Sequence, residues 1–109
     1  RWYGTTFKTD ATGRFMLLEL KHGNASLSGG QRHTWRLIDS LLRHADPEKK
    51  RYRGFYVVQT SQGEWTDDSC TFRVNGKLVT REAFHRFILG EDIGVRESFF
   101  TLKRESDNG

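Results

Sequence analysis

Glu19 and Lys21 lie two positions apart at the end of an apolar segment, residues 14–21, that is typical of a buried β-strand. Because strand side chains alternate between two faces, Glu19 and Lys21 share a face with Phe15 and Leu17. A carboxylate and an ammonium on one rigid face could act on a phosphodiester: the carboxylate binds a divalent metal ion and the ammonium orients the attacking water. The simpler interpretation is an exposed ion pair where the strand runs out into solvent.

Gln31 adds a polar group at the start of a predicted helix, which begins at Ser28, reaches about residue 44 and ends before Pro47. Ser28 with Gln31 three residues later is a capping-box pattern. Gln31 also lies one turn before Trp35, so we expect its side chain on the sheet-facing side, within reach of Lys21. It could instead serve only the capping box, and the two roles are compatible. The predicted apolar stripe consists of Trp35, Ile38, Leu42 and Ala45, with Leu41 beside it.

The remaining patterns predict an α/β fold with a mixed sheet. Residues 2–9 and 14–21 form a β-hairpin, and residues 55–60 form a central strand that returns parallel through a βαβ crossover. Asn75-Gly76 predicts a second hairpin over residues 71–79, followed by a helix over residues 80–89 and a last strand over residues 95–102. The buried stripe of that helix is expected to be Ala83, Phe84, Phe87 and Ile88. We expect one domain over residues 1–102 and a polar tail over residues 103–109.

Charge and composition give expectations for the kind of partner and for the cellular location. The chain has 109 residues and a formal net charge of +4, which favours a polyanionic partner. Cys70 is the single cysteine, so an intrachain disulfide is impossible and a reducing, intracellular location (cytoplasmic or nucleoid-associated) is expected. The sequence has no apolar run of membrane-spanning length, so no membrane partner is expected.

Basic side chains cluster around the first predicted helix. Arg32, Arg36 and Arg43 fall on one side of it, away from the apolar stripe, and further cations follow at its end. The Gly29-Gly30 pair is poor helix material, but free amides at a helix N-terminus bind phosphate and glycines permit close approach. For each cation the alternative is a solvated surface, and for the glycines it is loop geometry. The predicted nucleic-acid contacts are Ser28, Gly29, Gly30, Arg32, Arg36, Arg43, Lys49, Lys50, Arg51 and Arg53.

The order of these motifs resembles the PD-(D/E)XK nuclease superfamily. The residues that carry the resemblance are Glu19-Leu20-Lys21 and the segment Leu27-Ser28-Gly29-Gly30-Gln31-Arg32, between a hairpin and a parallel strand. They look most like the small virus-type replication-repair nuclease and Holliday-junction resolvase branches, over about residues 1–60. The resemblance implies a restriction-endonuclease-like core and hydrolysis of DNA, favoured over RNA, with Mg²⁺ or Mn²⁺. Glu19 and the Leu20 carbonyl would bind the metal, Lys21 would assist the water, Gln31 would position the site, and a homodimer is expected.

The family pattern also has an upstream acid as a second metal ligand, and Asp10 is the only acidic residue before Glu19. A hairpin that pairs Thr9 with Arg14 puts Glu19 opposite Gly4. Asp10 then lies roughly 17–20 Å along the strand from Glu19, too far for one metal ion to bridge. The second ligand would have to precede Arg1, come from Glu64, Asp67 or Asp68, or be missing.

The basic helix and the absent ligand also support a second hypothesis, a non-catalytic nucleic-acid-binding or partner-binding module on the same fold. A third is a basic surface that meets an acidic protein. Cleavage that depends on a divalent ion would indicate the nuclease, and salt-sensitive binding without turnover would indicate the binding module. No nucleic-acid binding at low salt would indicate the third.

Overall fold

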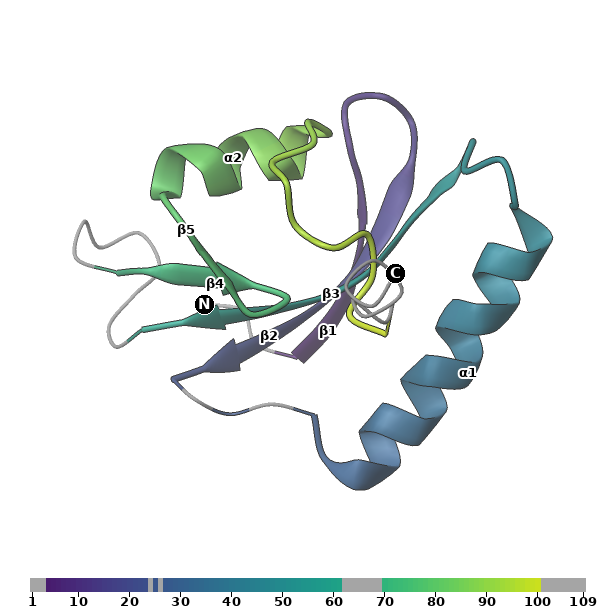
Figure 1. Ribbon diagram of the computed structural model, residues 1–109, viewed down its shortest axis with the longest axis horizontal. Helices are drawn as coiled ribbons and strands as arrows, with labels where there is room; N and C mark the ends of the chain where they lie inside the picture. Colours follow the sequence, from purple (N-terminus) through teal and green to yellow (C-terminus); the bar gives the residue numbers. More distant parts are fainter. Residues whose placement is uncertain (1–3, 24, 26, 62–69, 101–109) are drawn as a thin grey trace, which may run out of the picture.

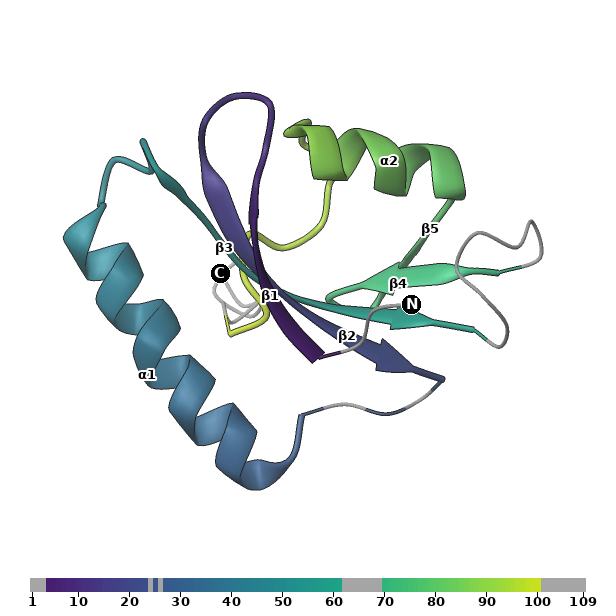
Figure 2. The same cartoon turned by 180° about the vertical axis from the view of Figure 1, so that it is seen from behind.

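The computed structural model of the chain describes residues 4–23, 25, 27–61 and 70–100, in which the strands form one five-stranded sheet with the order β1-β2-β3-β4-β5. Helices α1 and α2 lie on opposite faces of this sheet (Figures 1 and 2). In chain order the elements are β1 (Gly4–Thr9), β2 (Phe15–His22), α1 (Gly29–Ala45), β3 (Tyr52–Thr60), β4 (Phe72–Val74), β5 (Lys77–Val79) and α2 (Arg81–Leu89).

The centre of the sheet confirms the predicted α/β arrangement. β2 pairs antiparallel with β1 and parallel with β3, and α1 forms the crossover between β2 and β3. Glu19 is paired with Val57 of β3, so the candidate acid lies on an interior strand with neighbours on both sides. The predicted strand over residues 14–21 is shifted by one residue in the structure, and the strand predicted to begin at residue 55 begins at Tyr52.

The register of the first hairpin differs by one residue from the prediction. Thr9 pairs with Phe15 rather than Arg14, so Glu19 lies opposite Thr5 and not Gly4. The reason is the turn: the Asp10 amide donates to the Arg14 carbonyl at 2.7 Å, which leaves a three-residue loop. Gly13, with φ of +90°, supplies the left-handed residue that such a loop needs.

Alternation along the central strands builds a core on each face of the sheet. On the α2 face, Phe84 stacks on Phe72 at 4.5 Å and Phe87 meets Tyr56 edge-on at 4.8 Å. On the α1 face, Trp35 stacks on Phe55 at 5.3 Å. The α2-face core comprises Met16, Leu18, Leu20, Tyr56, Val58, Cys70, Phe72, Val74, Phe84 and Phe87. The α1-face core comprises Leu27, Phe55 and Val57, with Leu17, Trp35, Phe99 and Phe100 packed against it.

The β4–β5 hairpin and α2 follow their sequence signals closely. Asn75 and Gly76 have φ of +50° and +87°, the left-handed pair that a tight hairpin between β4 and β5 requires. Thr80 caps α2 by accepting a hydrogen bond from the Ala83 amide at 2.9 Å. Gly90 ends the helix in the left-handed region, at the predicted boundary of residue 89.

The buried face of α1 keeps part of the predicted stripe, because Trp35, Ile38 and Leu42 are half-buried and Trp35 packs on Phe55. Asp39 is the residue of α1 that is fully buried, while Leu41 is 67% exposed and Ala45 is exposed. The cause is a pair of long-range partners, because the Asp39 carboxylate accepts hydrogen bonds from the Tyr52 hydroxyl at 2.6 Å and the Ser98 hydroxyl at 3.0 Å. These bonds connect α1 to β3 and to the segment that follows α2.

Residues 95–100 do not form the predicted last strand; residues 101 and 102 lie outside the described part of the chain. This segment is instead held against β3 at separate points. The Phe99 amide donates to the Phe55 carbonyl at 2.6 Å. A Cβ at Gly54 would lie 1.9 Å from the Glu97 carbonyl oxygen, so only a glycine permits this approach.

Candidate functional site

The structure brings together the three residues that the sequence singled out for catalysis. The Lys21 Nζ atom lies 3.3 Å from a carboxylate oxygen of Glu19 and 3.4 Å from the Gln31 Oε1 atom. Glu19 and Lys21 are among the last four residues of β2, and Gln31 belongs to the first turn of α1. The cluster therefore lies where β2 ends, the edge at which ligands bind in many parallel α/β sheets.

Gln31 makes both contacts that its position suggested, with Lys21 and with Ser28. The Gln31 Oε1 atom accepts a hydrogen bond from the Ser28 backbone amide at 3.1 Å. The Gln31 backbone amide donates to the Ser28 hydroxyl at 3.2 Å. These two bonds complete the capping box and hold the same oxygen toward Lys21. Gly29 and Gly30 are exposed, with open space where a Cβ would stand.

Glu19 is buried, with an exposed fraction of 1%, whereas the Lys21 side chain is 21% exposed. A buried carboxylate is costly without a compensating charge, and Lys21 supplies one. A carboxylate beside a backbone carbonyl, here that of Leu20, offers the oxygen donors that Mg²⁺ and Mn²⁺ prefer. Within the described residues, however, no group of three or more acidic, histidine or cysteine side chains gathers around a common point.

None of the other acids considered as metal ligands is seen beside Glu19 in the described part of the chain. Asp10 lies at the far end of the hairpin, where its Oδ1 atom accepts hydrogen bonds from the Thr12 and Arg14 amides and its Oδ2 atom lies 3.4 Å from Arg53. It is not part of the Glu19 cluster, as the hairpin geometry predicted. Glu64, Asp67 and Asp68 lie outside the described residues.

Asp10 is charged because its hydrogen bonds and the nearby Arg53 lower its pKa by more than burial raises it. Burial by itself would raise the pKa of Asp10, but hydrogen bonds from Thr12 and Arg14, together with the charge of Arg53, lower it below the ordinary value of 3.8. The carboxylate thus acts as a structural anion between the first hairpin and β3.

The arginines of α1 lie along aromatic rings that the sequence did not associate with them. The Arg32 guanidinium lies 5.4 Å from the centre of the Phe99 ring, and that of Arg36 lies 5.9 Å from the Phe100 ring. Arg96 approaches Phe99 at 6.0 Å. The result is a surface of cations and aromatic rings along α1, beginning one residue after Gln31.

The remaining predicted nucleic-acid contacts do not gather with these. Arg43 binds the buried Asp39 carboxylate at 3.0 Å, and Lys49 pairs with Glu97. The Arg53 side chain is 7% exposed and donates to the Phe87 carbonyl at 2.8 Å, on the α2 side of the sheet. Lys50 pairs with Glu48 at 3.1 Å, and the Arg51 amide donates to Asp46 at 2.7 Å.

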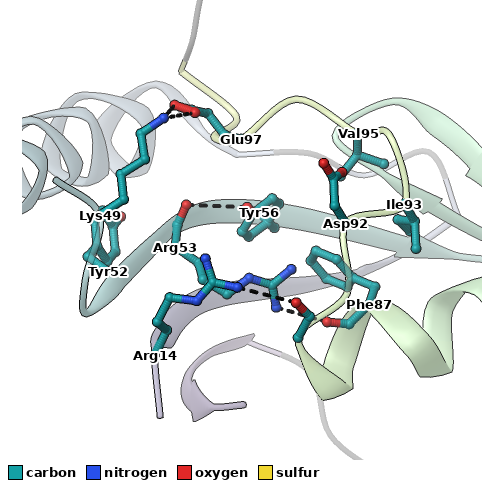
Figure 3. Close-up of a pocket in the computed structure, with 11 residues that line it drawn as sticks. Arg14, Lys49, Tyr52, Arg53, Tyr56, Phe87, Asp92, Ile93, Val95 and Glu97 are labelled. Carbon is teal, nitrogen blue, oxygen red and sulfur yellow. Dashed lines mark hydrogen bonds and ion pairs between the residues drawn. The ribbon is translucent and has the colours of Figure 1, made fainter. Parts of the chain in front are cut away.

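A hollow of about 340 Å³ lies away from the Glu19 cluster, between the start of β3, the end of α2 and the segment that follows α2 (Figure 3). Tyr56 lies in its floor, with Arg14 and Arg53 on one side and Asp92 on another. Burial raises the pKa of Tyr56 to about 12, so its hydroxyl keeps its proton at neutral pH. Sequence reasoning missed this hollow because its walls come from four separate segments.

Asp39 was missed as well, although a signal was present. It lies four residues after Trp35 and so shares the sheet-facing side of α1. Burial first, and then the hydrogen bond to Asp39, raise the pKa of Tyr52. The contacts of Asp39 tie α1, β3 and the segment after α2 into one structure.

Comparisons of the chain with protein-family models, with curated proteins and with solved structures find no match. Neither helix of the described chain combines the length and apolar character that crossing a bilayer would require.

Proposed function

We propose that this chain is a metal-dependent nuclease that hydrolyses phosphodiester bonds in DNA. The observation that carries the proposal is the contact of Lys21 with both Glu19 and Gln31 at the end of β2. The sequence predicted each of these residues as part of the site. They come from two elements, β2 and α1, that meet only in the folded chain. The proposal includes a restriction-endonuclease-like core, an intracellular location and action as a homodimer.

Glu19 and the Leu20 carbonyl are the groups that would hold Mg²⁺ or Mn²⁺. When bound, such an ion lowers the pKa of a coordinated water and offsets charge that develops on the phosphate. The two oxygen donors suit a hard cation but do not fill its coordination shell. The proposal therefore needs a further acid from outside the described residues, for which Glu64, Asp67 and Asp68 are the candidates within the chain.

Lys21 and Gln31 have the complementary role of positioning. The Lys21 ammonium is held between a carboxylate and an amide oxygen, which fixes its direction while leaving part of the side chain exposed. An ammonium fixed in this way can orient a water molecule or contact a phosphate oxygen. The exposed amides at Gly29 and Gly30 open the start of α1 to a second phosphate.

The surface of arginine and phenylalanine side chains along α1 would bind the part of the DNA strand that lies beyond the scissile phosphate. Cations contact the phosphate backbone without reading sequence, and guanidinium or aromatic planes can stack with bases. Arg32 and Arg36 supply the cations, beside Phe99 and Phe100. This arrangement supports nucleic acid rather than a small phosphate ester as the substrate.

The test is cleavage of labelled DNA with Mg²⁺ or Mn²⁺, compared with the same reaction in chelator. We expect Glu19→Gln and Lys21→Met each to lower the cleavage rate by about a hundredfold, because the first removes a metal ligand and the second removes the group that orients the water. Matched controls are Glu82→Gln and Lys8→Met, which alter exposed side chains on α2 and β1. Circular dichroism checks that the variants remain folded. Equal cleavage by the wild type and both site variants would remove the proposal.

A non-catalytic nucleic-acid-binding module is the second candidate, and the single acid of the described cluster favours it. This candidate predicts binding that weakens steeply with salt and needs no divalent ion. Replacing Arg32 and Arg36 by Gln should weaken that binding, while Glu19→Gln should leave it unchanged. Binding of this kind, with no cleavage in either metal, would select the module over the nuclease.

A further inference from the structure

The hollow beside Tyr56 is independent of the Glu19 cluster. It opens on the α2 side near the start of β3, whereas Glu19 faces α1 near the end of β2. Its volume of about 340 Å³ is within the range of small-molecule sites. Charged side chains of both signs line it, and their contacts show which of them are already used within the chain.

Two of the cations in the hollow, Lys49 and Arg53, already form ion pairs within the chain. Lys49 forms an ion pair with Glu97 across its rim (Figure 3). Arg53 is buried, lies 3.4 Å from the Asp10 carboxylate and donates to the Phe87 carbonyl at 2.8 Å. It also stacks on the Phe87 ring at 4.7 Å. These groups build the wall and have little capacity left for a ligand.

Arg14 and Asp92 are different, because each is only partly used. The Arg14 guanidinium donates from Nε to the Thr12 hydroxyl at 3.1 Å and from one terminal nitrogen to the Gly90 carbonyl at 3.2 Å. The Nε atom also lies 3.9 Å from the Asp10 carboxylate, while the remaining terminal N–H groups have no hydrogen-bond partner within the described part of the chain. Asp92 accepts one hydrogen bond, from the Gly94 amide at 2.9 Å, and its second carboxylate oxygen has no partner among the described residues.

The hollow also has an apolar wall beside Asp92. Ile93 and Val95 are half-buried and line the hollow beside Asp92, and Tyr56 lies between Arg14 and Asp92 (Figure 3). The hollow thus presents a partly used cation, a partly used anion and an apolar wall beside the anion. A simple anion would satisfy only Arg14, and a simple cation would satisfy only Asp92.

We propose that this hollow binds a small zwitterion of the amino-acid class. The ligand carboxylate accepts hydrogen bonds from Arg14, its ammonium donates to Asp92, and its side chain packs on Ile93, Val95 and Tyr56. Charge-assisted hydrogen bonds of this kind are stronger than neutral ones, so losing either charge of the ligand should weaken binding markedly.

The experiment is a titration of the ¹⁵N-labelled full chain with L-phenylalanine, followed by the amide signals of Ile93 and Val95. Two probes each lack one charge: phenylalaninamide has no carboxylate, and N-acetylphenylalanine has no ammonium. We expect L-phenylalanine to shift these signals saturably and each probe to bind at least about tenfold more weakly. Asp92→Asn should weaken L-phenylalanine binding by a similar factor, whereas Glu91→Gln, its exposed neighbour, should not.

Arg14→Gln provides the second arm, with weaker L-phenylalanine binding as the expected result. Because Arg14 also contacts Gly90, the Asp92→Asn variant keeps the test valid if Arg14→Gln does not fold. Three results would overturn the proposal: no saturable shift with L-phenylalanine, equal binding of the singly charged probes, or unchanged affinity in Asp92→Asn.

Discussion

Asp39→Ala is expected to lower the free energy of unfolding by about 3–5 kcal/mol, because it leaves buried polar partners uncompensated. Asp39 is fully buried and accepts from the Tyr52 hydroxyl at 2.6 Å and the Ser98 hydroxyl at 3.0 Å. It also pairs with Arg43 at 3.0 Å. Its removal deprives three partners at once and breaks the buried hydrogen bond between α1 and the segment after α2.

Urea denaturation followed by circular dichroism measures this loss. Ser40→Ala is the matched control, since Ser40 is the exposed neighbour of Asp39 on the same helix. Tyr52→Phe should cost less than Asp39→Ala, and the double variant should cost less than the sum, because both remove the same hydrogen bond. A loss below about 1 kcal/mol for Asp39→Ala would show that the carboxylate does not hold α1 in place.

Asp10→Asn should lower the free energy of unfolding at pH 7 by about 2–4 kcal/mol, the second-largest effect that we expect on stability. Asn at this position keeps an acceptor for the Thr12 and Arg14 amides but loses the charge that faces Arg53. The Arg53 guanidinium would then remain buried beside a neutral group. Glu48→Gln, which removes an exposed carboxylate, is the control.

The effect of Asp10→Asn should depend on pH with a definite sign. The pKa of Asp10 in the folded chain is below 3.8, the ordinary value that the unfolded chain has. Its contribution to stability is therefore complete above about pH 5 and is lost as pH falls through the folded-state pKa. The stabilities of the wild type and Asp10→Asn should begin to converge near pH 3.8 and should meet only below the lower, folded-state pKa. A difference that stays constant down to acid pH would contradict the role of the charge.

Local signals explain why most elements could be predicted from the sequence. Asn75-Gly76 fixes a hairpin because few other residues tolerate two successive left-handed conformations. Ser28 and Thr80 set the starts of both helices, since their side chains satisfy amides that the helix leaves free. The alternation of residues 15–21 placed Glu19 and Lys21 on one face, and Gln31 followed from helical spacing.

The missed features depend on contacts between distant segments. Asp39 is buried because Tyr52 and Ser98 meet it, and neither partner can be inferred from the helix itself. Residues 95–100 carry strand-forming side chains, but the segment is anchored point by point against Gly54 and Phe55. The hairpin register shifted because the Asp10 side chain and Gly13 together closed a shorter loop.

The central claim, that Glu19 and its neighbours form a divalent-metal site for phosphodiester chemistry, is tested most directly by paramagnetic broadening with Mn²⁺. The amide signals of Leu20, Lys21 and Gln31 should broaden at low Mn²⁺ concentration, and excess Mg²⁺ should restore them. Glu19→Gln should abolish the broadening, while Glu82→Gln should leave it unchanged. Broadening centred elsewhere, or unaffected by Glu19→Gln, would contradict the account.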